Sequence, residues 1–202
     1  MGIYAAKPRF QRALEGPAAA LARSRVHPDQ ITGSALLLSF LGGLALAGSA
    51  AEPRLLLLVP LVTVGRTVLN ALDGLVARRT GQSRPWGEVL NEVGDRAADL
   101  AFFGGVALAP GSDARLAGLV VAVMLLTSYL GTAAKAAGGR RQYGGIMGKA
   151  DRMIWLGLAA VIAFLCPTWP VWPAFLVGVM SGLVVTFAQR LRGSYVDLES
   201  AR

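Results

Sequence analysis

The stretch of sequence that decides the fold reads NALDGLVAR at residues 70–78 and, after a short connection, GEVLNEVGD at residues 87–95. Both pieces place acidic and amide side chains within apolar surroundings. The connection contains Gly81 and Pro85, and it is short enough to make the flanking helices antiparallel neighbours. The stretch therefore predicts a helical hairpin that carries polar residues on both arms.

The polar residues of each arm share one helix face, because residues three, four and seven positions apart lie above one another on a helix. The first face contains Asn70, Asp73, Gly74 and Ala77, and the second contains Gly87, Asn91, Asp95 and Asp99. We expect the two faces to meet at one end of a helix bundle.

The composition of the chain is that of a membrane protein. Of its 202 residues, 54% are hydrophobic and only 16% are charged, whereas soluble domains average about 25% charged residues. The net charge of +8 could suggest nucleic-acid binding, but the basic residues fall between apolar runs, so we expect no nucleic-acid partner. The single cysteine, Cys166, leaves no disulfide framework or thiolate metal site, and the polar N-terminal residues predict no cleaved signal peptide.

Six apolar runs cover residues 33–50, 55–72, 89–108, 116–137, 153–165 and 171–188. Crossing a bilayer takes about 20 mainly apolar residues, so these runs predict about six transmembrane helices. The predicted fold class is all-α, a polytopic membrane protein whose residues 1–202 form a single domain. We expect its transmembrane bundle at 33–190, between an interfacial segment at 1–32 and a cytoplasmic tail at 191–202.

The interfacial segment contains an amphipathic stretch at residues 8–25, in which apolar side chains are interleaved with arginines. This pattern is typical of a helix that lies in the membrane interface, and Gly16-Pro17 is expected to break that helix. His27 follows in a turn, where we expect a local structural role rather than a catalytic one.

Basic residues are concentrated in alternate connections, before the first run and after the second, fourth and sixth. They are Lys7, Arg9, Arg12, Arg23, Arg25, Arg78, Arg79, Arg84, Arg140, Arg141, Lys149, Arg190 and Arg192. By the positive-inside rule, we expect a multi-pass protein of the cell (inner) membrane with both termini in the cytoplasm. The polar stretch then faces the cytoplasm as well.

Carboxylates inside a membrane are costly and normally have a partner or a function. Oxygen ligands that converge from two helices suit a hard divalent cation, Mg²⁺ or Mn²⁺, which can bind a diphosphate. Gly74 and Ala77 are small enough for a nucleotide to approach the helix backbone, and Arg78 could clamp a phosphate oxygen. The alternative reading, interhelical contacts worth about 0.6–2 kcal/mol, does not require small residues at these offsets.

The stretch resembles the signature of the CDP-alcohol phosphotransferase (phosphatidyltransferase) family, D-x2-D-G-x2-A-R-x8-G-x3-D-x3-D. Every spacing of that pattern is kept between Asn70 and Asp95. The residues identical to the pattern are Asp73, Gly74, Ala77, Arg78, Gly87 and Asp95. The expected six spans and interfacial helix are also similar to that family, so the resemblance covers most of the chain.

The resemblance implies an enzyme of phospholipid biosynthesis that transfers a phosphatidyl group from a CDP-linked donor, CDP-diacylglycerol, to an acceptor alcohol and releases CMP. It implies that Mg²⁺ or Mn²⁺ is held by Asn70, Asp73, Asn91 and Asp95, and that Asp95 is the general base. It implies that the nucleotide diphosphate lies against Gly74, Ala77, Arg78 and Gly87. It also implies contact with membrane lipids and association into a homodimer.

The sequence departs from the family pattern at two positions, where Asn70 and Asn91 replace aspartates. An amide oxygen can coordinate a hard cation but brings no charge, so the formal charge of the four-residue set falls from −4 to −2. Three further acids near Asn91 could compensate for the lost charge: Glu88, Glu92 and Asp99. The alternative is a weakened or inactive relative that binds nucleotide or lipid.

A second group of basic residues is the candidate acceptor site. In the family, basic residues of the later spans line the acceptor pocket, so the resemblance implies an anionic or polyhydroxyl acceptor, often a phosphorylated one. The candidates are Arg66, Lys135, Arg140, Arg141, Lys149 and Arg152. For Arg140 and Arg141 the alternative is that they only mark the cytoplasmic side under the positive-inside rule, and for Arg66 the alternative is neutralisation of Asp73. A transporter is the less favoured class, because its intramembrane acids usually lie near the bilayer midplane.

Overall fold

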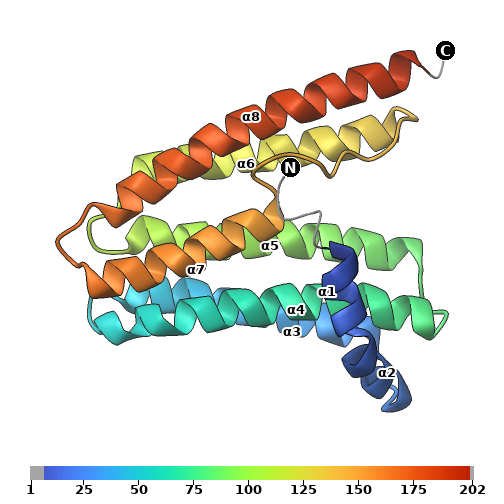
Figure 1. Cartoon of the computed structure of the whole chain (residues 1–202), viewed down its shortest axis with the longest axis horizontal. Helices are drawn as coiled ribbons and strands as arrows, with labels where there is room; N and C mark the ends of the chain where they lie inside the picture. The colour runs from blue at the N-terminus through green and yellow to red at the C-terminus, as the bar shows by residue number, and fades with distance from the viewer. Residues whose placement is uncertain (1–6, 201–202) are drawn as a thin grey trace.

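The computed structural model describes residues 7–200, and within that range it is all-helical, without a strand. Its elements are α1 (Lys7–Ala13), α2 (Glu15–Arg23), α3 (Pro28–Gly48), the 3-10 helix η2 (Pro53–Leu57), α4 (Leu58–Arg79), α5 (Pro85–Leu108), α6 (Ala114–Ala136), α7 (Lys149–Leu165) and α8 (Val171–Glu199). Figure 1 shows the six long helices, α3 to α8, lying along the long axis of the molecule, with α1 and α2 across one end. The predicted all-α fold is confirmed.

Each of the six apolar runs forms one of the long helices. Within residues 7–200, four segments are long and apolar enough to cross a membrane: α3, η2 together with α4, α6 and α8. Helix α5 carries several charged residues along its first half, and α7 is 17 residues long. The count of six spans therefore stays a prediction, while four membrane-spanning helices are supported by length and composition.

The helices pack around α3 and α5. Helix α3 packs against both α4 and α5, α7 packs against α4, and α6 pairs with α8 (Figure 1). The prediction that α4 and α5 are direct neighbours is wrong, because they make little contact with each other and α3 lies against both. The two polar arms of the hairpin are therefore connected by long side chains, such as Arg66 of α4 reaching Asp95 of α5, and not by close packing of the two helices.

Close packing of α3 on α5 depends on two glycines. A Cβ atom at Gly43 would lie 2.3 Å from the carbonyl oxygen of Ala101, and one at Gly105 would lie 2.3 Å from the carbonyl oxygen of Gly43. Small residues of this kind let two membrane helices approach until their backbones touch. Phe102 and Phe103, both fully buried, fill the core beside this contact.

The N-terminal segment differs from the prediction in the position of its break. The chain bends at Leu14, between α1 and α2, and not at Gly16-Pro17. Pro17 lies in the first turn of α2, where a missing N–H costs no helical hydrogen bond. Leu14 and Ala18 are buried against residues of α3 and α4, so part of this amphipathic face packs on protein.

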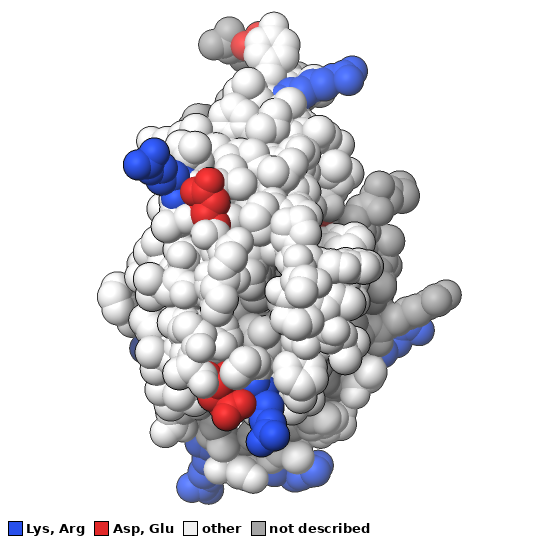
Figure 2. Space-filling model, turned by 90° about the vertical axis from the view of Figure 1, so that its left-hand side faces the viewer, with Lys and Arg blue, Asp and Glu red and all other residues white. Residues whose placement is uncertain are grey.

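The structure also defines the turn at His27 and the C-terminal segment more closely than the sequence does. His27 is the N-cap of α3, where its Nδ1 accepts the backbone N–H of Asp29 at 3.2 Å, as expected for a structural residue. The tail predicted after residue 190 continues as helix, because α8 runs to Glu199. Figure 2 views the end of the bundle away from α1 and α2, and this end carries few charged side chains.

Candidate active site

A cavity of about 620 Å³ opens at the charged end of the bundle, between α4, α5, α7 and the connection that precedes α7. Most of the predicted site residues line it: Arg66, Asn70, Asp73, Gly74, Arg78, Glu88, Asn91, Glu92, Asp95, Arg141, Lys149 and Arg152. Five predicted residues are not among its lining: Ala77, Gly87, Asp99, Lys135 and Arg140. The structure thus brings together motif residues and basic residues that are far apart in sequence.

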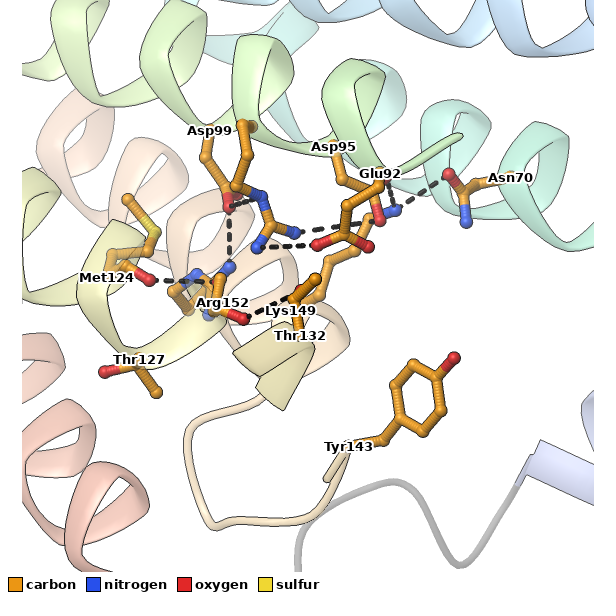
Figure 3. A network of polar contacts seen from close by, with 12 residues as sticks. Asn70, Glu92, Asp95, Asp99, Met124, Thr127, Thr132, Tyr143, Lys149 and Arg152 are labelled. Atoms are coloured by element: carbon orange, nitrogen blue, oxygen red, sulfur yellow. Dashed lines mark hydrogen bonds and ion pairs between the residues drawn. The ribbon is translucent and has the colours of Figure 1, made fainter. Parts of the chain in front are cut away.

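Asp95 lies at the centre of the polar network in this cavity. Its Oδ1 accepts a hydrogen bond from Arg66 Nη2 at 3.1 Å and another from Lys149 Nζ. Lys149 Nζ also donates to Asn70 Oδ1 at 2.7 Å, so its ammonium joins α4, α5 and α7 (Figure 3). Arg66 is only 2% exposed, so its charge depends on Asp95 for neutralisation.

Asp73 is held from two sides. Thr32 Oγ1, at the start of α3, donates to Asp73 Oδ2 at 3.0 Å, and the backbone N–H of Gly74 donates to Oδ1 at 2.5 Å. Each carboxylate oxygen has more than one lone pair, so both can still accept a further ligand. Thr32 was not among the predicted site residues, because nothing in the local pattern connects it to Asp73, which is 41 positions away.

Asn91 carries an acceptor that no other residue in the described range 7–200 satisfies. Its Oδ1 is buried and has no hydrogen-bond partner, although the residue lines the cavity. A buried unpaired oxygen is costly, and a cation or a ligand donor in the cavity would satisfy it. This oxygen is the clearest sign in the described residues that the cavity is built for an occupant.

The donor set suits one hard cation better than several. Among the described residues, no group of three or more His, Cys, Asp or Glu side chains converges as a metal site. The possible metal ligands in the cavity are therefore two carboxylates, Asp73 and Asp95, and the amide oxygen of Asn91. Mg²⁺ is commonly bound by one or two carboxylates, with waters and substrate phosphates as the other ligands. The residues present therefore fit a single Mg²⁺ or Mn²⁺ completed by a diphosphate.

The three predicted compensating acids all face basic side chains. Glu88 accepts a hydrogen bond from Lys135 Nζ at 2.5 Å, and Glu92 accepts one from Arg141. Asp99, which is fully buried, accepts one from Arg152 Nη2 at 2.9 Å (Figure 3). In this arrangement the acids position arginines and a lysine, and their role as metal ligands stays a prediction.

Arg96 links these acids and was missed by the sequence analysis. Its guanidinium lies 3.5 Å from Glu92, 3.9 Å from Asp95 and 4.0 Å from Asp99. The one-turn spacing of these acids around Arg96 on one helix could have revealed it.

The connection between α6 and α7 closes one side of the cavity. Arg141 lies 4.7 Å from the centre of the Tyr143 ring and pairs with Glu92. Burial opposes the charge of Arg141, but the hydrogen bond that Arg141 donates to Glu92 and the nearby charges of Glu92 and Glu88 prevail and raise the pKa of the guanidinium above its ordinary value.

Arg190 of α8 fixes this connection and also lines the cavity. Its Nε donates to the carbonyl oxygen of Gly144 at 2.9 Å, Nη1 to that of Thr127 at 2.9 Å, and Nη2 to that of Tyr143 at 3.3 Å. No local pattern singles out Arg190, whose sequence context indicates only a positive charge near the cytoplasmic tail.

Two predicted acceptor residues lie outside the cavity. Lys135 pairs with Glu88 at the rim. Arg140 is bound to Asp197 of α8, through its backbone N–H at 2.5 Å and its Nε at 2.8 Å. Of the basic group, Arg66, Arg141, Lys149 and Arg152 face the cavity, and Arg190 joins them.

Comparison with known proteins gives consistent matches for this sequence and fold. The family model for CDP-alcohol phosphatidyltransferase matches residues 25–189. The inner membrane protein YnbA of Escherichia coli is 38% identical over 185 residues, which is 92% of each chain. Phosphatidylinositol phosphate synthase of Mycobacterium marinum is 36% identical over 135 residues, covering 61% of this chain and 56% of that enzyme.

Two solved structures of Mycobacterium tuberculosis phosphatidylinositol phosphate synthase are similar in fold. The structure with CDP-DAG bound has a TM-score of 0.72 and 27% identity, over 91% of this chain and 94% of that one. The structure in complex with manganese and citrate has a TM-score of 0.70 and 26% identity, over 89% of this chain and 88% of that one.

Proposed function

The chain belongs to the CDP-alcohol phosphatidyltransferase family, and from this premise we propose that it transfers a phosphatidyl group from CDP-diacylglycerol to an acceptor alcohol, releasing CMP. One observation carries the proposal. Six of the motif residues of α4 and α5 line a single cavity together with basic residues of α7 and α8; they are Asn70, Asp73, Gly74, Arg78, Asn91 and Asp95. A similar protein has been solved with CDP-DAG bound, and another structure of it contains manganese.

The donor side of the site is formed by α4 and the start of α5. Gly74 and Arg78 line the cavity, and Gly74 leaves room for a diphosphate beside the helix. Arg78 is exposed at the end of α4, where its guanidinium can bind phosphate oxygens bidentately. Ala77 and Gly87 flank this region, and we propose that they permit close approach of the nucleotide.

A divalent cation, Mg²⁺ or Mn²⁺, would be held by Asp73, Asp95 and Asn91, with Asn70 beside them. When bound, it supplies charge neutralisation for the diphosphate and the leaving CMP. The buried, unpaired Oδ1 of Asn91 supports this assignment.

Asp95 is proposed as the base that receives the proton of the acceptor hydroxyl. Its Oδ1 is engaged by Arg66 and Lys149, whereas its Oδ2 lies 3.9 Å from Arg96 and accepts no hydrogen bond from the residues that the structure describes. The proton can therefore be taken up at Oδ2 while Oδ1 stays fixed. Fixing one oxygen of the carboxylate sets the position of the other, as general base catalysis requires.

The acceptor is proposed to carry a phosphate or another anionic group. Arg141, Arg152 and Arg190 approach the cavity from three different elements, and guanidinium groups bind phosphate through paired hydrogen bonds. Arg152 and Arg141 are each backed by an acid, which orients them without occupying all their donors.

The test is CMP release by the purified protein in lipid nanodiscs with CDP-diacylglycerol, Mg²⁺ or Mn²⁺, and matched pairs of phosphorylated and unphosphorylated alcohols. We expect CMP release with a phosphorylated acceptor, and a loss of about 10²-fold or more in Asp95→Asn. Asp113→Asn is the control, because Asp113 caps α6 at the other end of the bundle and Asn is an equally good cap.

The two asparagines favour one alternative, a relative that binds the donor without turnover. CDP-diacylglycerol binding with no CMP release from any acceptor would establish that alternative and refute the enzymatic proposal. Uptake of an anion into proteoliposomes without CMP release would instead indicate a transporter. We further propose a homodimer, as the family resemblance implies, which cross-linking in native membranes would test.

A further inference from the structure

Lys149 occupies the position between Asn70 and Asp95, two residues of the proposed cation site. Its Nζ donates to Asn70 Oδ1 at 2.7 Å and to Asp95 Oδ1 (Figure 3). The two oxygens come from different helices, α4 and α5, and Lys149 reaches them from the first turn of α7. An ammonium that bridges oxygens of two helices makes the same link that a metal ion would make.

The charges around Lys149 are balanced without a metal. Asp95 accepts hydrogen bonds from both Lys149 and Arg66, and Asp73 lines the same cavity, so two negative charges face two positive charges there. With aspartate at position 70, Lys149 and a divalent ion would compete for the same carboxylate. With Asn70, the amide oxygen accepts from the ammonium, and no negative charge is left over at this position.

We propose that the ammonium of Lys149 takes the place of one divalent cation, so that this chain binds fewer metal ions than a family site with four aspartates. This proposal rests on the proposed function because it concerns the same cavity, but it does not require that the chain releases CMP. Asn70 and Lys149 form a matched pair. Asparagine in place of the family's aspartate at position 70 removes the charge that would attract a metal ion, and the ammonium of Lys149 lies where that ion would bind. The metal that remains binds on the side of Asp73 and Asn91.

The test counts Mn²⁺ binding to the full chain in detergent, with Mn²⁺ alone, from the electron paramagnetic resonance signal of the free ion. Four proteins are compared: wild type, Asn70→Asp, Lys149→Met and the double variant. We expect Asn70→Asp alone to change the affinity by less than about threefold, since Lys149 pairs with the new carboxylate. We expect Asn70→Asp/Lys149→Met to bind a further Mn²⁺, or to bind Mn²⁺ about tenfold more tightly or better.

The control for net charge is Asn70→Asp/Lys135→Met, which removes a lysine that pairs with Glu88 at the rim. It should bind Mn²⁺ like Asn70→Asp alone. A gain of about tenfold in Asn70→Asp itself, or equal gains in the two double variants, would overturn the proposal. If Lys149→Met does not fold, the comparison of wild type with Asn70→Asp still decides, since it leaves Lys149 in place. Donor and acceptor are absent, so the result is independent of whether the chain releases CMP.

Discussion

The ion pair between Asp99 and Arg152 gives the most direct test of how the site is held together. Asp99 is 0% exposed and Arg152 is 4% exposed, with Nη2 and Oδ2 2.9 Å apart. The pair joins α5 to α7 and so fixes one wall of the cavity. The perturbation is the replacement of each residue by an apolar one of similar size, Asp99→Leu and Arg152→Met, singly and together.

The loss of an interhelical hydrogen bond and the presence of an unpaired buried charge differ in their cost to stability. An ordinary hydrogen bond between membrane helices is worth about 0.6 kcal/mol on average and about 1.7 kcal/mol at most. Leaving one buried charge without its partner costs about 3–5 kcal/mol, whereas removing both charges together is often nearly neutral. Because both side chains are buried, we expect each single variant to lose about 3–5 kcal/mol and the double variant to recover most of this loss.

The assay is unfolding by SDS in mixed micelles, followed by tryptophan fluorescence, from which the free energy of unfolding is obtained. For a chain of this size, a loss of 1 kcal/mol also corresponds to about 2–4 °C in melting temperature, so the single variants should melt about 6–20 °C lower. If both single variants lose less than about 1.7 kcal/mol, the pair is an ordinary interhelical contact and the argument from buried charge fails. If the double variant loses as much as the two singles combined, the two residues are not coupled.

Gly105→Ala should destabilise the fold by about 1–3 kcal/mol, because its Cβ would lie 2.3 Å from a backbone oxygen of α3. The control Gly104→Ala should be neutral or slightly stabilising, because no atom lies within 4 Å of its Cβ position. SDS unfolding measures the free energy of unfolding of both variants. Arg190→Lys should raise the KM for the acceptor about tenfold with a smaller change in kcat. The three carbonyl oxygens are bound by three different nitrogens of the guanidinium, and the single nitrogen of a lysine cannot reach all three positions. An unchanged KM would show that the connection before α7 does not contribute to acceptor binding. Chelation of divalent ions should lower the melting temperature of the wild type less than that of an Asn70→Asp/Asn91→Asp variant, and Mn²⁺ should restore both. An equal loss in the two proteins would contradict the proposed charge balance.

The fold was predictable because it depends on local patterns. Apolar runs identify the long helices, since each helix must bury or expose to lipid a continuous apolar surface. The spacing from Asn70 to Asp95 likewise places its residues on helix faces that line one cavity. The break near Gly16-Pro17 was placed wrongly for a local reason, since a proline is well tolerated in the first turn of a helix.

The partners across the cavity were not predictable from such patterns. Thr32 and Asp73 are 41 positions apart, and Lys149 and Asn70 are 79 positions apart. Helical periodicity relates residues within one helix, and the arrangement of different helices depends on contacts such as that of Gly43 with α5. Basic residues were therefore grouped by sequence, and only the structure separates those that face the cavity from Lys135 and Arg140.

The two asparagines of the motif are best understood together with the basic residues that face them. Four carboxylates in this cavity would need cations to be tolerated in a membrane protein, because uncompensated charge is costly there. Two carboxylates opposed by Lys149 and Arg66 form a neutral set, in which Asp95 is hydrogen-bonded to both cationic side chains and Asp73 is held by Thr32 and Gly74. Retaining Asp73 and Asp95 keeps one carboxylate for a cation and one for proton transfer, which is the smallest set that the proposed reaction requires. On this reasoning the substitutions adjust the number of metal ions in the site and leave its chemistry in place.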